Sequence, residues 1–207
     1  MNYIQGLIMG LAYLAPIGVQ NLFVINTALT QNLKRSIITA LIVIFFDISL
    51  ALACFLGIGA IMERSKIIEM LILLIGSILV IFIGVSLTRS KTNMETSADV
   101  DIPIKRVVTT ACVVTWFNPH AIIDGTMMLG AFKATLSSGE GIKFISGVAS
   151  ASCVWFLGIV LIIKLFSKRI NARVMRTINV VCGAVIIFYG LKLFYSFIEK
   201  AFSIMNG

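Results

Sequence analysis

The chain alternates long apolar runs with short polar segments. Six of these runs reach the roughly 20 residues that a helix needs to cross the hydrocarbon core of a bilayer. They are Ile4 to Leu29, Ser36 to Met62, Ile67 to Leu87, Val107 to Phe132, Ile142 to Phe166 and Thr177 to Ile198. Because backbone polar groups must be satisfied internally within lipid, the runs predict six transmembrane helices in an all-α integral membrane protein.

One long polar stretch, Thr88 to Arg106, divides the runs into two sets of three. We therefore expect a first three-helix repeat over residues 1–88, a polar linker over residues 89–106 and a second three-helix repeat over residues 107–207. Each half begins with a run that contains a proline, continues with a run that has polar residues at mid-depth, and ends with a plain apolar run. An odd number of spans per repeat predicts that the two repeats are inverted in the membrane.

Two of the three prolines, Pro16 and Pro119, interrupt the first run of each half. Proline lacks an amide donor, so a transmembrane helix tolerates it only where other groups satisfy the freed carbonyl. Gly18 permits the backbone conformations of an unwound segment, and Asn118 is suited to cap a half-helix that starts at Pro119. We therefore predict two broken helices, with Pro16, Gly18 and Pro119 at the breaks. Such paired breaks indicate the binding site of a transporter.

Small residues recur at four-residue spacing in the first and fifth runs. Gly6 and Gly10 form one pair, and Gly147 and Ala151 form the other. This spacing is typical of helices whose backbones approach closely in a membrane. It predicts tight helix packing at both places.

Composition and charge agree with a membrane location. The 207 residues are 59% hydrophobic, which is more apolar surface than a soluble domain can bury. The net charge of +8 does not indicate a nucleic-acid partner, because the Lys and Arg residues are dispersed between the apolar runs. Eleven of the seventeen lie in the segments after the first, third and fifth runs when Lys164, near the end of the fifth run, is counted with the segment that follows it. The positive-inside rule places those segments in the cytoplasm and both termini outside.

Asp47 and Asp124 are the two acidic residues that lie well inside apolar runs, and no Lys or Arg lies at comparable depth. A charged Asp at the centre of a membrane helix costs about 2.5 to 3.5 kcal/mol on the insertion scale. We therefore expect both aspartates to bind a substrate cation and to carry protons. The alternative is that they only accept hydrogen bonds from backbone groups at the breaks.

A half-helix N-terminus carries partial positive charge and free amides, which suit the carboxylate of an amino acid. Together with the aspartates, this predicts a site that binds groups of both signs. The further substrate-binding candidates are polar groups near the breaks and one aromatic residue that can stack on a cation, although packing is an alternative role for it. These candidates are Gln20, Asn21, Asn118 and Trp155.

Several motifs together resemble the LysE family of amino acid exporters, over nearly the whole chain. They are the run from Pro16 to Phe23, the pair Phe46 and Asp47, the run from Thr115 to Gly125, and the run from Ser152 to Gly158. Relatives that export neutral amino acids usually carry a Pro-Gly-Pro-Asn motif at the first break, whereas Gln20-Asn21 is similar to the branch for basic amino acids.

The resemblance implies export of L-lysine, L-arginine or both across the inner membrane of a bacterium. It also implies functional aspartates in the second and fourth spans, which correspond to Asp47 and Asp124. Ile122-Ile123 stands where family members often have an aromatic residue, and this departure leaves the choice between lysine and arginine open.

No phosphate-binding loop is present in the sequence, so we expect a secondary transporter without a cofactor. Moving a positive charge out of a cell costs about 2.3 kcal/mol per 100 mV, and exchange for a proton cancels that charge. We expect the two repeats to rock around the site during this antiport. The partners would be the basic amino acid, protons and the bilayer; a homo-oligomer is compatible with the sequence but is not predicted by it.

Other functions remain open at this point. An exporter of neutral amino acids, of the homoserine or threonine type, or of a divalent metal ion would use the same fold. An enzyme is not expected, because the sequence has no Ser/His/Asp triad order, no H-E-x-x-H motif and no Cys/His cluster. The four cysteines lack metal-site spacing and are expected to be reduced.

Overall fold

The computed structural model describes residues 2–16, 18–57, 66–89, 103–130, 132–133, 136, 139–167 and 172–205. These residues form helices and short connections, with no strand among them. The prediction of an all-helical protein is confirmed for this part of the chain. Residues 90–102, which make up most of the predicted linker, lie outside the described residues, as does the end of the second predicted span after Gly57.

The first predicted helix forms two helices, α1 (Asn2–Leu14) and α2 (Val19–Thr30), whose axes meet at 82°. α3 (Leu33–Leu56) follows after a short connection. The Asn32 side chain caps α3 by accepting a hydrogen bond of 2.8 Å from the Arg35 amide. α3 ends at Gly57, whose φ of +97° is a left-handed conformation that favours glycine. α5 (Lys66–Thr88) completes the first half.

The second half begins with α6 (Ile104–Trp116), directly after Pro103. α7 (Pro119–Gly125) follows a break, and the π-helical turn η1 (Thr126–Gly130) continues it. Two long helices, α9 (Gly141–Ser167) and α10 (Ala172–Met205), end the chain. π-Helical turns like η1 are rare, and those that occur are frequently at functional sites.

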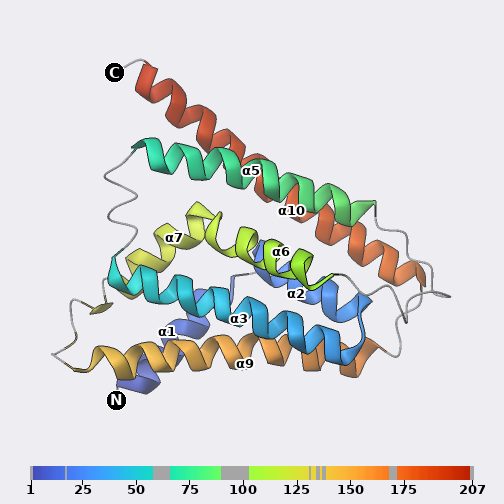
Figure 1. The fold of residues 1–207 in the computed structure, drawn as a ribbon, viewed down its shortest axis with the longest axis horizontal. Helices are drawn as coiled ribbons and strands as arrows, with labels where there is room; N and C mark the ends of the chain where they lie inside the picture. Colours follow the sequence, from blue (N-terminus) through green and yellow to red (C-terminus); the bar gives the residue numbers. More distant parts are fainter. Residues whose placement is uncertain are drawn as a thin grey trace.

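Two pairs of long helices enclose the short ones. α3 packs beside α9, and α5 packs beside α10 (Figure 1). α2, α6 and α7 lie between these pairs and touch helices of both, while α1 packs along α9. The short helices α2, α6 and α7 therefore lie in the interior of the helix arrangement.

Glycines allow backbones to touch in the α1–α9 contact. A Cβ atom built on Gly6 would lie 2.0 Å from the carbonyl oxygen of Phe144, and one on Gly147 would lie 2.1 Å from that of Tyr3. A Cβ on Gly10 would lie 2.7 Å from the Ala151 Cβ. The predicted close packing of these small residues is confirmed.

Glycines also allow backbones to approach closely in the α5–α10 contact. A Cβ on Gly84 would lie 3.0 Å from the carbonyl oxygen of Gly183, and a Cβ on Gly183 would lie 2.9 Å from that of Gly84. These two helices therefore also pack with their backbones close together. The side chains of Ile187 and Thr88 also lie against these glycines, at 2.7 Å from a Cβ on Gly84 and 2.5 Å from a Cβ on Gly183.

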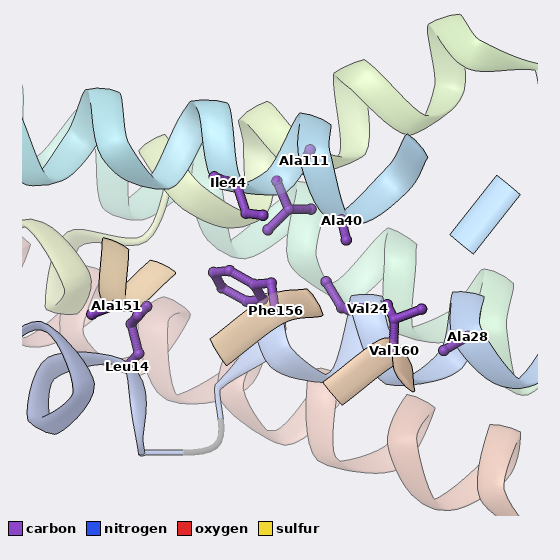
Figure 2. Close-up of a cluster of buried hydrophobic side chains, with 10 residues drawn as sticks. Leu14, Val24, Ala28, Ala40, Ile44, Ala111, Ala151, Phe156 and Val160 are labelled. Atoms are coloured by element: carbon purple, nitrogen blue, oxygen red, sulfur yellow. The ribbon is translucent and has the colours of Figure 1, made fainter. Parts of the chain in front are cut away.

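The largest apolar cluster joins α1, α2, α3, α6 and α9. Figure 2 shows the ring of Phe156, which is fully buried, among side chains that include Ile44 of α3 and Val24 of α2. On the outside, large apolar side chains such as Phe45, Phe82 and Phe188 are about two-thirds exposed, at 68%, 69% and 66%. An apolar exterior of this kind suits a lipid environment.

Within the described residues, three helices are long and apolar enough to cross a membrane: α3, the segment Gly141–Phe166 of α9 and the segment Val180–Phe202 of α10. The bent pair of α1 and α2 is a fourth candidate span. Shorter apolar helices cover Met70–Ser86 and Ala121–Gly130. These correspond to the third and fourth predicted spans, and the full set of six spans as inverted repeats stays a prediction.

Candidate functional site

Asp47 lies in the middle of α3 and is 1% exposed. Its carboxylate accepts a hydrogen bond of 2.5 Å from Ser152 Oγ of α9 and one of 3.3 Å from Gln20 Nε2 of α2. Both donors are neutral, and no cationic side chain of the described residues pairs with Asp47. Three helices thus converge on a buried carboxylate that has two hydrogen-bond donors and, in the described part of the chain, no counter-charge.

Asn21, the neighbour of Gln20, satisfies the backbone at the first break. Its amide nitrogen Nδ2 donates to the carbonyl oxygens of Leu14 and Pro16 at 3.1 and 3.0 Å. Its Oδ1 accepts a hydrogen bond of 2.9 Å from Trp155 Nε1 of α9. The side chain is 5% exposed and replaces donors that the interrupted helix has lost. A substrate-binding role for Asn21 and Trp155 stays a prediction, because their polar groups bind each other here.

Gly18 is the N-cap residue of α2 and leaves that helix end open. No side chain caps this terminus, and a Cβ built on Gly18 would have no atom within 4 Å. The backbone has φ −112° and ψ −173°, an extended conformation that any residue can adopt. The special backbone freedom expected of Gly18 is therefore not used. What the glycine leaves here is unfilled space next to free helix amides.

The second break is closed in a different way. Asn118 caps α7 by accepting a hydrogen bond of 3.4 Å from the Ala121 amide, and α7 begins at Pro119. Gly76 allows α5 to pack closely against the backbone at this break, since a Cβ atom on Gly76 would lie 2.2 Å from the carbonyl oxygen of Phe117. The N-terminus of α7 thus has a side-chain cap, whereas that of α2 has none.

Asp124 is exposed at the end of α7, unlike Asp47. The side chain of Tyr13, which is half-buried in α1, interacts electrostatically with both aspartates and with Cys54. Tyr13 also donates a hydrogen bond of 3.2 Å to the carbonyl oxygen of Ala121. Sequence reasoning did not select Tyr13. The only signal in the sequence was its position three residues before Pro16.

The structure thus brings Asp47, Gln20, Asn21 and Trp155 together around the first break. Asn118 and Asp124 lie at opposite ends of α7, and Tyr13 lies near both aspartates. A second tryptophan, Trp116, donates to Ser49 Oγ at 3.1 Å and so fixes the end of α6 against α3. Ser152, which is fully buried, was not predicted as a site residue.

The sequence profile of the LysE type translocators matches residues 11–197. The chain belongs to this family. Its LysE-type relatives include the "Arginine exporter protein ArgO" of Escherichia coli strain K12, which is 32% identical over 198 residues, or 92% of each chain. A protein of the same name from Klebsiella pneumoniae strain 342 is 29% identical, and the alignment covers 99% of this chain and 98% of that protein. Another from Pectobacterium atrosepticum is 30% identical, over 92% of this chain and 94% of that protein.

No solved structure matches this LysE-type fold. The family and the apolar helices identify a multi-pass protein of the bacterial inner membrane. Membership in a family of translocators assigns the protein to transport. The predicted resemblance to the LysE family and the predicted location are confirmed.

Proposed function

We propose that the protein exports basic L-amino acids, arginine, lysine or both, from the cytoplasm in exchange for protons. The relatives that cover nearly the whole chain are named arginine exporters. The single observation that carries the proposal beyond those names is the buried Asp47 carboxylate, which lacks a cationic partner within the described residues. A cationic substrate and a proton can each supply the missing positive charge.

The ammonium or guanidinium group of the substrate would bind at Asp47. Two neutral donors, Gln20 and Ser152, hold the carboxylate in a fixed direction, and both can rearrange when a cation arrives. Ionisable groups within membrane helices usually mark substrate or proton pathways, because their burial is costly otherwise. This makes Asp47 the main candidate for cation binding.

The α-carboxylate of the substrate would bind at the N-terminus of α2. This helix end has no side-chain cap and has open space at Gly18, whereas the α7 terminus is capped by Asn118. Gln20 lies in the first turn of α2 and contacts Asp47, so the two halves of the site are adjacent. A free helix N-terminus favours an anion through its amides and its dipole.

The contacts between helices support two related halves, as the proposed inverted repeats require. In this comparison α1, α2, α3 and α5 of the first half correspond to α6, α7, α9 and α10 of the second. The contact of α1 with α9 then corresponds to that of α6 with α3, and the contact of α2 with α10 to that of α7 with α5. The α3–α9 and α5–α10 pairs are their own counterparts under the same correspondence. A pattern of this kind is expected of transporters whose binding site lies at the interface of the repeats.

Protons would exchange with the substrate at the two aspartates. Asp47 is sealed inside the protein and Asp124 is exposed, so they can serve successive steps of release. Protonation of a carboxylate removes the charge that holds the cation and thereby promotes its departure. Exchange of one proton for one monovalent cation moves no net charge, so the membrane potential has no effect on it.

Counterflow into proteoliposomes tests this function. Labelled arginine, lysine and threonine are offered to vesicles that are loaded with the same unlabelled compounds, with and without a pH gradient. We expect uptake of arginine or lysine that responds to the gradient. Uptake of threonine alone would indicate a neutral amino acid exporter, and saturable exchange of a divalent metal without any amino acid would indicate a metal exporter; either result contradicts the proposal.

A further inference from the structure

The side chain of Tyr13 packs against α7, where its hydroxyl contacts Ala121 and its ring lies beside Gly125, the residue after Asp124. The Tyr13 side chain interacts electrostatically with Asp47 of α3, which is 1% exposed, and with Asp124 of α7, which is exposed. The residue belongs to α1, so it reaches this place from a third helix. A phenol that interacts with both a buried and an exposed carboxylate is in a position to affect movement of a cation from one to the other.

Two neighbouring carbonyls of α7 hold side chains at this place. The Tyr13 hydroxyl donates to the Ala121 carbonyl at 3.2 Å, and Cys54 Sγ donates to the Ile122 carbonyl at 3.5 Å. α1 and α3 are thereby both attached to α7, one residue apart. Both contacts must change if α7 moves relative to the other two helices.

The backbone of α7 leaves room for the phenol at Gly125. A Cβ atom there would lie 3.3 Å from both Cε2 and the hydroxyl oxygen of Tyr13, and 2.9 Å from Cys54 Sγ. Tyr13 and Cys54 therefore both lie against Gly125, the residue that follows Asp124. The Cys54 side chain is fully buried in this arrangement.

We propose that Tyr13 is a positioning residue of the transport site that closes the route between Asp47 and Asp124, with its hydrogen bond to Ala121 holding the route shut. A substrate cation would displace the hydroxyl and pass along the face of the ring, where a cation is attracted by the aromatic quadrupole. This inference rests on the proposed export of basic amino acids for its substrate. The proposed closure does not depend on the identity of the substrate and can be tested without any substrate.

Cys54 provides a reporter that is already in the chain. In a protein in which Cys112, Cys153 and Cys182 are replaced by alanine, the rate at which a small water-soluble methanethiosulfonate reagent modifies Cys54 measures access past Tyr13. The variants are Tyr13→Phe, which keeps the ring and loses the hydroxyl, and Tyr13→Ala, which loses both. Tyr3→Phe is the matched control, because it removes a hydroxyl of the same helix that bonds Ser150 at 2.9 Å, far along α1 from the aspartates.

We expect modification of Cys54 to be several-fold faster in Tyr13→Phe and at least tenfold faster in Tyr13→Ala, with no change in Tyr3→Phe. Equal rates in the unmodified protein and Tyr13→Phe, at matched thermal stability, would overturn the proposal. If Tyr13→Ala does not fold, Tyr13→Phe decides the question alone.

Arginine and lysine counterflow by the same variants separates this inference from the proposed function. We expect Tyr13→Phe to change the KM for the cation more than the maximal rate, and Tyr3→Phe to change neither. Absence of counterflow in every protein, together with faster labelling in the Tyr13 variants, would reject the substrate and keep the closure. Normal counterflow with unchanged labelling would reject the closure and keep the substrate.

Discussion

Ser152 of α9 donates a hydrogen bond of 2.5 Å to the carboxylate of Asp47 of α3, across 105 positions of sequence. Both side chains are buried, at 0% and 1% exposure. A hydrogen bond to a charged group contributes about 1.5 to 3 kcal/mol, so this contact holds the carboxylate toward α9. It also joins the helix of the second predicted span, α3, to that of the fifth, α9.

Asp47→Asn should reduce arginine and lysine counterflow at least tenfold with little effect on folding. The amide keeps the size of the side chain, and its oxygen still accepts from Ser152, but the negative charge is gone. Counterflow per unit of purified protein and the melting temperature in detergent measure the two effects. Glu199→Gln, an exposed position on α10, is the control and should behave as the unmodified protein. A wild-type rate in Asp47→Asn would exclude this carboxylate as the cation site.

Ser152→Ala should have an intermediate effect. Of the described residues, the variant leaves Gln20 as the only hydrogen-bond donor to the Asp47 side chain, so the carboxylate keeps its charge and loses its closest partner. We expect a several-fold higher KM for arginine with a smaller change in maximal rate. Ser152→Thr keeps the hydroxyl and should restore part of the affinity. A KM that is the same in all three proteins would show that orientation by Ser152 is unimportant.

An acidic vesicle lumen should accelerate uptake of arginine several-fold. Protons then leave the lumen down their gradient while the cation enters, as antiport requires. A potassium diffusion potential without a pH gradient should have no effect, because the exchange of one proton for one monovalent cation moves no net charge. Asp47→Asn and Asp124→Asn should each abolish the response to pH. Uptake driven by the potential alone would instead indicate uniport.

Gly18→Asp should fold normally and lose transport. The carboxylate is a favourable N-cap for α2, and the structure has no atom within 4 Å of the position of the new Cβ. The same carboxylate would occupy the place that we assign to the α-carboxylate of the substrate. Gly18→Ala is the matched control and should retain most of the activity. Full counterflow in Gly18→Asp would mean that the substrate carboxylate binds elsewhere.

Gly147→Ala should lower the stability of the protein in detergent. Its Cβ would lie 2.1 Å from the carbonyl oxygen of Tyr3, so α1 and α9 would have to separate, at a cost of about 1 to 3 kcal/mol or more. Gly158→Ala, on the same helix, meets no atom within 4 Å and gains helix propensity. Thermal unfolding should therefore distinguish the two substitutions. Equal melting temperatures would contradict the backbone contact between α1 and α9.

Local pattern was sufficient for the helices and for some of the places where they pack closely. The apolar runs predicted helices because lipid leaves few other choices, and the spacing of Gly6 and Gly10 predicted close packing there because small residues at that spacing share a face; the partner helix was not predicted. The bend of 82° between α1 and α2 was not predictable. A proline shows where a helix is interrupted, whereas the direction of the next segment depends on the helices packed around it.

Long-range partners account for most of what sequence reasoning missed. Tyr13 lies 108 positions from Ala121, and Ser152 lies 105 positions from Asp47, so no local period connects either pair. Asn21 was predicted from its polarity alone. The structure adds that the Asn21 side chain donates hydrogen bonds to two carbonyls at the first break. These partners depend on the bend between α1 and α2.

The glycine contacts also limit which parts of the molecule can move as units. Gly6 and Gly147 join a helix of the first half to one of the second, and Gly84 and Gly183 do the same for α5 and α10. Helices whose backbones touch in this way cannot slide apart without losing both contacts. We therefore expect these mixed pairs to move as units during transport, with hinges at the breaks next to Pro16 and Asn118.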